Sequence, residues 1–305
     1  MKYKVFVDGG EGTTGLKIHE YFKKRDDIEL LTIDSEKRKD LDERLSLITK
    51  ADVSFLCLPD AAAREIAAAA PKDARILDTS TAHRTAPDWT YGMPEITKTR
   101  RDEIRESNRV AVPGCHASGT IMLIKPLLDA GIVDADYPFA VTSLTGYSGG
   151  GKKMIAQYEA GGDEALLSPR QYGIAQHHKH LPEIMAVTGI KNAPGFMPIV
   201  ANYYSGMEVT IPIQGCKATR EQTLEIFKEF YDGQKMVSVL DSIDDGGFIA
   251  ANRLAGTNRM EITVEGNDDN ILLVATYDNL GKGASGAAVQ NMNIMLGLDE
   301  EKGLL

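Results

Sequence analysis

Cysteine is scarce in this sequence of 305 residues, which contains only Cys57, Cys115 and Cys216. The three lie far apart and form no C-x-x-C pair, a pattern that argues against a disulfide framework and against a thiol-rich zinc site. A cysteine that has a function in this chain is therefore expected to act through its own reactivity.

Long apolar runs and large basic clusters are also lacking. Apolar runs such as 53–58 stop far short of the roughly 20 residues that a membrane-spanning helix needs, and the N-terminal segment has no signal-peptide pattern. Acidic residues outnumber basic ones by 44 to 34, and the longest basic cluster, 37–39, is flanked by Glu36 and Asp40. These features predict a cytoplasmic protein with no membrane or nucleic-acid partner.

The first third of the chain alternates short apolar runs with stretches of helical spacing. Strands are expected at 4–8, 29–34, 53–58 and 75–78, with helices between them at 16–24, 41–49 and 61–70. Strands separated by helices of about ten residues imply right-handed crossovers and a parallel sheet covered on both faces. The pattern predicts an α/β domain of the Rossmann type.

After residue 113 the texture changes to glycine-rich turns and alternating strands. The expected elements there are strands at 137–144 and 204–212 and a hairpin at 259–265 and 270–276. They predict a second, α+β domain with a mainly antiparallel sheet. The chain then closes with a helix expected at 284–296.

A glycine-rich turn, Gly9-Gly10-Glu11-Gly12-Thr13-Thr14-Gly15, follows the first expected strand and precedes a helix. Glycine lets backbone N–H groups approach a pyrophosphate, and the positive end of the helix dipole favours negative charge. The spacing G-x-x-G-x-x-G differs from the usual dinucleotide fingerprint. The turn predicts a dinucleotide site, and the alternative is a turn that serves only tight strand-to-helix packing.

The end of the next expected strand carries residues that point to different cofactors. Asp34 lies about 20 residues past the glycines, where an acidic side chain accepts hydrogen bonds from the ribose and favours NAD. Lys37 and Arg38 would instead neutralise the 2′-phosphate of NADP. From these residues alone the choice stays open, and a mixed-charge surface loop is the third interpretation.

Cys115 follows a Pro113-Gly114 turn and precedes an apolar helix expected at 120–128. This arrangement points the thiol at a helix N-terminus, whose dipole and free N–H groups stabilise a thiolate and can hold an oxyanion. The sequence therefore predicts a nucleophile, and the alternative is a buried cysteine with a packing role.

Three of the six histidines, His177, His178 and His180, fall within four positions. His178 and His180 would share one face of an extended segment. A neutral imidazole beside a thiol can accept its proton and later donate one to an oxygen. Zinc binding is the weaker alternative, because no further ligands lie at a usual local spacing. A third alternative is that the histidines are surface or interface residues without a chemical role.

Several stretches together resemble the short form of the N-acetyl-gamma-glutamyl-phosphate reductases, a family grouped with the aspartate-semialdehyde dehydrogenases. The matching stretches, in chain order, are residues 8–15, 55–59, 78–84, 91–95, 113–115, 148–151, 178–183 and 278–291. The chain departs from the commoner long form at Ala82-His83 and at His116. The resemblance covers essentially the whole chain.

The resemblance implies a domain organisation and roles for named residues. The dinucleotide-binding domain would comprise residues 1–114 and 284–305, and the catalytic domain, which also serves dimerisation, residues 115–283. Cys115 would be the nucleophile and His178 or His180 the acid and base, while Arg84 and Glu183 would place the substrate. No metal is implied. The candidate residues for an NADP cofactor are Gly9, Gly12, Thr13, Thr14, Gly15, Ser35, Arg38, Ser148, Gly149 and Asn279.

The implied activity is the NADPH-dependent reduction of N-acetyl-L-glutamyl 5-phosphate to N-acetyl-L-glutamate 5-semialdehyde, with release of phosphate, as in arginine biosynthesis. Cys115 would form a thioester, which divides one hard step into two easier ones. The resemblance also implies a homo-oligomer. The residues alone leave open the same chemistry on aspartyl or aminoadipyl phosphate and, more remotely, a dinucleotide-binding sensor without catalysis.

Overall fold

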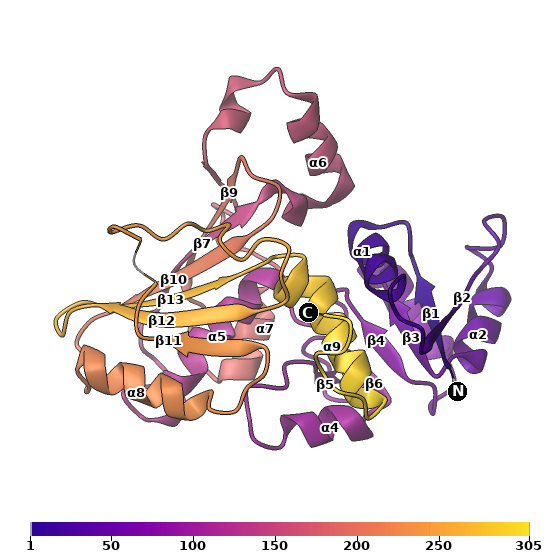
Figure 1. Cartoon of the computed structure of the whole chain (residues 1–305), viewed down its shortest axis with the longest axis horizontal. Helices are drawn as coiled ribbons and strands as arrows, with labels where there is room; N and C mark the ends of the chain where they lie inside the picture. The colour runs from indigo at the N-terminus through magenta and orange to yellow at the C-terminus, as the bar shows by residue number, and fades with distance from the viewer. Residues whose placement is uncertain (1, 244, 305) are drawn as a thin grey trace. The chain divides into compact units, whose positions relative to one another are not determined.

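The computed structural model describes residues 2–243 and 245–304, and the chain divides into two compact units (Figure 1). The first unit comprises Met1–Pro113 and Ala284–Leu305, and the second comprises Gly114–Gly283. Gly114, expected in the first domain, belongs to the second unit, where it is the residue that caps the helix carrying Cys115.

In the described residues of the first unit, six strands form a sheet in the order β2-β1-β3-β4-β6-β5, and every neighbouring pair is parallel. The strands are β1 (Tyr3–Asp8), β2 (Ile28–Leu31), β3 (Val53–Leu56), β4 (Ile76–Asp78), β5 (Thr90–Tyr91) and β6 (Arg109–Ala111). The helices are α1 (Thr13–Phe22), α2 (Leu41–Lys50), α3 (Asp60–Ala69), α4 (Arg100–Glu106) and α9 (Gly286–Met295). This is the predicted α/β architecture.

The order of the strands locates the ligand-binding end of this sheet. The chain runs outward from β1 to β2 on one side and from β3 onward on the other, so the strand order reverses between β1 and β3. In open parallel sheets, ligands bind beyond the carboxyl ends of the strands at such a reversal. The glycine-rich turn follows β1 at this point.

Helix α9 returns from the second unit and is buried at all of its ten residues. In Figure 1 it is the yellow helix, and it packs on α1, α4 and β4 of the first unit. Its polar side chains are buried with partners: Asn291 donates to the carbonyl of Gly92 at 2.8 Å, and Gln290 donates to the carboxylate of Glu95 at 2.9 Å. These bonds offset the cost of burying amides. They fasten the end of the chain to the first unit.

The second unit contains a mixed sheet in its described residues, with the order β11-β12-β13-β10-β7-β9-β8. Four neighbouring pairs are antiparallel, while β11–β12 and β7–β9 are parallel. The strands are β7 (Ala140–Gly146), β8 (Arg170–Gln171), β9 (Gly195–Ala201), β10 (Met207–Ile213), β11 (Val237–Leu240), β12 (Met260–Gly266) and β13 (Ile271–Tyr277). The helices and helical turns are α5 (Cys115–Asp129), η1 (Tyr147–Gly150), α6 (Gly151–Ala160), η2 (Glu164–Leu167), α7 (Leu181–Thr188), α8 (Arg220–Phe230) and the turn η3 (Gly281–Ser285), which leads out of the unit.

Helix α5 is the central helix of this unit and packs on β10, β13, α7 and α8. Pro126 lies inside it and has no N–H, so the carbonyl of Met122 lacks its usual partner four residues on. The hydroxyl of Tyr231, at the end of α8, donates to this carbonyl at 2.6 Å. A buried side chain from another helix thus compensates for the proline.

We expect Tyr231→Phe to lower the free energy of unfolding by about 1–3 kcal/mol, because it leaves the buried Met122 carbonyl without a donor. The measurement is urea unfolding followed by circular dichroism. Tyr137→Phe is the matched control, since the Tyr137 hydroxyl donates to the carbonyl of Gln214 at an exposed position. Equal losses in the two variants would contradict the expectation.

Candidate active site

Cys115 is the first residue of α5, which begins five residues before the helix expected at 120–128. Gly114 precedes it in an extended conformation, with φ −77° and ψ 148°. The N–H groups of the first helical turn have no partner within the helix, and together with the helix dipole they favour a negative charge on sulfur. The partly buried thiol therefore lies where a thiolate is stabilised.

The backbone that leads into Cys115 is held by α7. One carboxylate oxygen of Glu183 accepts a hydrogen bond from the N–H of Gly114 at 3.1 Å, and Glu183 is only 1% exposed. The hydroxyl of Ser118 donates to the carbonyl of Gly114 at 3.1 Å. Glu183, expected to help place the substrate, thus contacts the peptide adjacent to the nucleophile.

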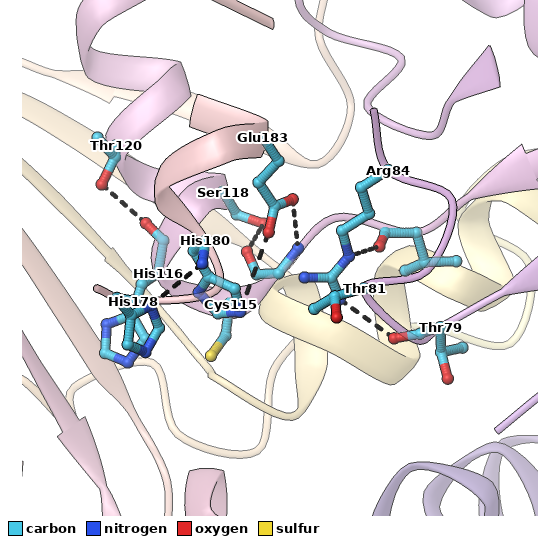
Figure 2. A network of polar contacts seen from close by, with 12 residues as sticks. Thr79, Thr81, Arg84, Cys115, His116, Ser118, Thr120, His178, His180 and Glu183 are labelled. Carbon is cyan, nitrogen blue, oxygen red and sulfur yellow. Dashed lines mark hydrogen bonds and ion pairs between the residues drawn. The ribbon is translucent and has the colours of Figure 1, made fainter. Parts of the chain in front are cut away.

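Three histidine rings gather beside Cys115 (Figure 2). The ring centroids of His178 and His180 lie 4.7 Å apart, and His116 lies 5.5 Å from His178 and 5.6 Å from His180. His177, by contrast, is exposed and is not part of this cluster. The cluster therefore joins the residue that follows the cysteine to the histidine motif before α7.

The expectation of an extended segment for His178 and His180 is wrong. His180 has helical backbone angles, φ −87° and ψ −13°, and caps the N-terminus of α7. Its N–H donates to Nδ1 of His178 at 3.2 Å. The two rings meet because the chain turns at this point, where α7 begins at Leu181. They do not meet by the side-chain alternation of a β-strand.

His180 and Glu183 form a buried pair. Nε2 of His180 lies 4.0 Å from a carboxylate oxygen of Glu183, and their side chains are 5% and 1% exposed. The spacing of three residues across the first turn of α7 puts both side chains on one face of the helix. A carboxylate beside an imidazole orients the ring. This arrangement suits a group that accepts and returns a proton.

His178 has a different environment. Burial, and to a lesser degree the positive charge of Lys179, lowers the pKa of His178 to about 4. The ring is therefore neutral near pH 7, whereas an acid catalyst must carry a proton when it acts. Of the two histidines between which the sequence does not decide, His180 is the one whose Nε2 lies 4.0 Å from the carboxylate of Glu183.

Sequence reasoning missed a buried chain of hydrogen bonds centred on His116. Its Nδ1 lies 2.7 Å from the hydroxyl of Ser143 and its Nε2 lies 2.5 Å from the hydroxyl of Tyr172. Burial lowers the pKa of His116 to about 3 and raises the pKa of Tyr172, so both groups stay uncharged. The position of His116 directly after Cys115 was the available signal, whereas no pattern marked Tyr172.

The two depressed histidine pKa values predict a dependence of stability on pH. Unfolding returns His178 and His116 to their ordinary pKa of 6.5 from folded values of about 4 and about 3, so the unfolded chain binds more protons below pH 6.5. The contribution of these two histidines to the free energy of unfolding is complete above pH 6.5. It decreases as the pH falls toward the folded pKa values of about 4 for His178 and about 3 for His116.

The measurement is the midpoint of urea unfolding of the whole protein, followed by circular dichroism at pH 7 and at pH 5. We expect a lower midpoint at pH 5, and a smaller difference in His178→Gln, because glutamine does not titrate. His177→Gln is the control, since that ring is exposed. An unchanged midpoint in the wild type between the two pH values would contradict this.

Arg84 lies in the first unit, in the segment that follows β4. Its Nε donates to the carbonyl of Val112 at 2.9 Å and one of its terminal nitrogens donates to the carbonyl of Thr79 at 3.1 Å. The same segment is ordered by the buried carboxylate of Asp78, which accepts from Ser80 and from His83. The guanidinium is thus fixed by backbone carbonyls on a rigid turn.

The glycine-rich turn contains glycines of two kinds. Gly9 has φ +81°, and a Cβ there would lie 2.2 Å from the carbonyl oxygen of Cys57; a Cβ on Gly15 would lie 2.6 Å from the Cα of Gly10. Packing alone therefore requires these glycines. At Gly12 the nearest atom to such a Cβ, the carbonyl oxygen of Gly9, is 3.4 Å away, which is an ordinary contact.

The absence of a side chain at Gly12 is thus not explained by protein packing. Gly12 caps α1 without a side-chain hydrogen bond, and the N–H groups of Thr13, Thr14 and Gly15 occupy the first turn of that helix. These N–H groups have no partner within the helix and are suited to bind an anion. The turn fits a pyrophosphate that approaches the backbone at Gly12.

The loop after β2 holds the residues that the sequence associates with NADP. Strand β2 ends at Leu31, earlier than the expected 34, and Asp34 accepts a hydrogen bond from the N–H of Glu36 within its own turn. Arg38 forms an ion pair with Glu11 of the glycine-rich turn at 2.6 Å. Arg38 therefore lies beside that turn, and Ser35 is exposed in the same loop.

The remaining cofactor candidates form one cluster in the second unit. The side chain of Asn279 donates to the hydroxyl of Ser148 at 3.0 Å and accepts from the N–H of Gly206 at 2.9 Å. A Cβ on Gly149 would lie 3.5 Å from the amide nitrogen of Asn279. Ser148 and Asn279 are buried, which fixes the backbone of the turn η1.

Two searches of the described residues were negative. No group of three or more histidine, cysteine, aspartate or glutamate side chains in residues 2–243 and 245–304 is arranged to hold a metal ion. No helix in the same part of the chain has both the length and the apolar character to cross a membrane.

Comparisons with known proteins give two family matches. Residues 4–106 match the family described as "Semialdehyde dehydrogenase, NAD binding domain", and residues 115–279 match "Semialdehyde dehydrogenase, dimerisation domain". The first match lies within the unit that carries the glycine-rich turn. This unit is a nicotinamide-dinucleotide-binding domain.

Curated relatives match along nearly the whole chain. The N-acetyl-gamma-glutamyl-phosphate reductase 2 of Nostoc sp. is 42% identical over 320 residues, which cover 99% of this chain and 99% of the relative. The N-acetyl-gamma-glutamyl-phosphate reductase of Brucella suis is 42% identical over 309 residues, covering 97% of this chain and 100% of the relative.

Solved structures share the fold at lower identity. Aspartate semialdehyde dehydrogenase II from Vibrio cholerae, complexed with ASA, has a TM-score of 0.71 at 18% identity and covers 97% of this chain and 99% of its own. A probable aspartate-semialdehyde dehydrogenase from Pseudomonas aeruginosa has a TM-score of 0.73 at 15% identity, with 97% and 99% coverage.

Proposed function

Since this chain belongs to the N-acetyl-gamma-glutamyl-phosphate reductase family, we propose that it reduces N-acetyl-L-glutamyl 5-phosphate to N-acetyl-L-glutamate 5-semialdehyde and releases phosphate. The observation that carries the proposal is the placement of Cys115 at the start of α5, beside the buried pair of His180 and Glu183. A thiolate and an adjacent proton donor are the groups that a thioester route requires.

In the proposed mechanism the Cys115 thiolate attacks the acyl carbon and phosphate departs, so that a thioester remains on the sulfur. The negative charge that develops on the carbonyl oxygen is stabilised by N–H groups of the first turn of α5. A nicotinamide dinucleotide, when bound, would supply the hydride that reduces the thioester.

His180 is the proposed acid and base. It accepts the thiol proton before the attack and returns a proton to the alkoxide oxygen of the thiohemiacetal. His180 takes this proton back as the thiohemiacetal collapses, so that the carbon–sulfur bond breaks, the aldehyde leaves and Cys115 is restored as a thiolate. Glu183 holds the ring of His180 and, through the N–H of Gly114, the peptide next to the nucleophile. Arg84 is proposed to bind the carboxylate or phosphate of the substrate, since its planar fork pairs with either.

The proposed cofactor is NADP. Gly12 leaves room for a pyrophosphate at the N-terminus of α1, and Arg38 lies beside the same turn, where it can pair with a 2′-phosphate. Asp34, which would favour NAD, accepts a hydrogen bond within its own loop. In the second unit, Ser148, Gly149 and Asn279 are proposed to border the nicotinamide. We also propose that the chain acts as a homo-oligomer through the unit that matches a dimerisation domain.

The assay runs in the aldehyde-oxidising direction. N-acetyl-glutamate 5-semialdehyde is supplied with phosphate and either NADP or NAD, and the absorbance of the reduced nicotinamide is followed. We expect phosphate-dependent turnover that is faster with NADP. Activity on aspartate semialdehyde in its place would reject the substrate, and faster turnover with NAD would reject the cofactor preference.

Gly12→Ala tests the proposed pyrophosphate cradle. We expect NADPH binding to weaken about tenfold or more, because the methyl group would occupy the space through which phosphate oxygens reach the backbone. Thermal stability is expected to be unchanged, since the nearest protein atom leaves ordinary contact distance. Binding is measured by NADPH fluorescence. The control is Gly195→Ala at an exposed position of the second unit, where an added Cβ would lie 3.9 Å from the carbonyl oxygen of Phe139. Wild-type affinity in Gly12→Ala would contradict the cradle.

A further inference from the structure

Tyr277, the last residue of β13, makes two hydrogen bonds to the first turn of α5. Its hydroxyl donates to the carbonyl of Cys115 at 2.6 Å and accepts from the N–H of Gly119 at 3.1 Å. The side chain is 0% exposed. A strand of the central sheet is therefore tied directly to the backbone of the nucleophile.

The two groups that the hydroxyl bridges are four residues apart. In an α-helix the carbonyl of residue 115 and the N–H of residue 119 bond to each other. The Tyr277 hydroxyl therefore bonds to both members of the pair that closes the first turn of α5. Side chains that enter this ladder alter the local course of a helix. The hydroxyl thus sets the geometry of the turn from which the Cys115 side chain projects.

The packing around the phenol leaves little freedom. A Cβ on Gly119 would lie 2.7 Å from the Tyr277 hydroxyl and 2.8 Å from its ring, so only glycine fits there while the ring keeps its place. A Cβ on Gly283 would lie 3.2 Å from Cβ of Cys115 and 3.4 Å from the Tyr277 ring. Glycines on both sides let the ring approach the nucleophile's backbone this closely.

The Tyr277 hydroxyl also stays protonated and can therefore donate a hydrogen bond. Burial, together with the nearby Cys115 side chain, raises the pKa of Tyr277 well above its usual value. The hydroxyl therefore keeps its proton near neutral pH. The bond to the Cys115 carbonyl is therefore present throughout the reaction.

We propose that Tyr277 is a positioning residue that holds the first turn of α5, and with it the Cys115 sulfur, in register with the histidine cluster. The inference rests on the proposed role of Cys115 as nucleophile. Stabilisation of a thiolate by helix N–H groups depends on where the sulfur lies relative to the turn, and misplacement of about 1 Å can cost about 100-fold in rate.

Tyr277→Phe tests this role cleanly. Loss of the hydroxyl leaves the Cys115 carbonyl and the Gly119 N–H free to bond to each other, so no buried group loses its partner and the variant is expected to fold. We expect kcat to fall about 10- to 100-fold with KM within about twofold of wild type. Independently of any substrate, alkylation of Cys115 by iodoacetamide at pH 7 should slow by about tenfold and its pH profile should move upward.

Alkylation is followed by mass spectrometry of the peptide that contains Cys115, which separates this residue from the other two cysteines. Tyr231→Phe is the matched control. It removes a buried phenol hydroxyl that also donates to a carbonyl of α5, but this carbonyl belongs to Met122, about two helical turns beyond Cys115. We expect lower stability but an unchanged alkylation profile. Because the alkylation needs no substrate, failure of the proposed activity would leave this result readable.

Gly119→Ala is the second variant, since its methyl group would displace the Tyr277 hydroxyl, and slower alkylation of Cys115 is expected here too. The proposal is overturned if Cys115 in Tyr277→Phe alkylates at the wild-type rate. It is equally overturned if Tyr277→Phe does not fold while Gly119→Ala alkylates normally, because Tyr277 would then have a structural role alone.

Discussion

Cys115→Ser is expected to lower kcat by about 10⁴-fold or more, because a serine hydroxyl at this position stays protonated where the thiol ionises. The helix N-terminus that stabilises a thiolate cannot ionise an alcohol near neutral pH. Binding of the dinucleotide should remain at the wild-type level, since Cys115 is not among the residues proposed to hold it.

The decisive measurement is a single-turnover experiment without nicotinamide. Wild-type protein mixed with the acyl phosphate should release about one phosphate per chain in a rapid burst as the thioester forms. Cys115→Ser should show no burst. Cys216→Ser is the matched control, because its thiol lies in a loop and donates to the carbonyl of Ala218 at 3.0 Å. A wild-type burst in Cys115→Ser would refute the thioester route.

His180→Asn is expected to lower kcat by about 10²- to 10⁴-fold, the range for loss of a general acid and base. Asparagine keeps a polar side chain of similar size at the start of α7 but cannot transfer the proton. The effect should lie on kcat, because His180 is assigned to proton transfer and not to binding. The dependence of kcat on pH should lose the ionisation of this group.

His178→Asn is the comparison that distinguishes the two rings. Burial lowers the pKa of His178 to about 4, so this ring is uncharged at pH 7 and lacks the additional proton of an imidazolium, and the variant should lose far less activity. Glu183→Gln should lie between the two, since it keeps a hydrogen-bond acceptor for Gly114 but removes the charge beside His180. A greater loss in His178→Asn than in His180→Asn would transfer the role to His178.

The elements that the sequence predicts well are those whose burial pattern is local. Val53–Leu56 is buried at every position, as expected for a strand covered on both faces, and the helices on either side follow from their apolar spacing. The turn before α5 was predicted from Pro113 and Gly114, because these residues restrict the backbone before any tertiary contact forms, although the helix begins five residues earlier than the expected 120.

The histidine motif shows where local patterns fail. Two histidines two residues apart suggest one face of a strand, but the backbone at His180 is helical because α7 begins directly after it. A spacing of two residues does not distinguish a strand from a turn when the following helix sets the direction of the chain.

By itself the sequence determined the α/β and α+β classes, the glycine-rich turn between β1 and α1, and the place of Cys115 at a helix N-terminus. These follow from propensity, periodicity and backbone restriction, which act over a few residues. Tertiary structure alone decided which groups surround the thiol. Tyr172 and Tyr277 approach α5 from strands or loops more than 50 residues away in the chain. The pKa of His116 falls mainly because the ring is buried, and Glu183 meets Gly114 across 69 positions. Such contacts depend on packing between distant segments, which no local pattern encodes.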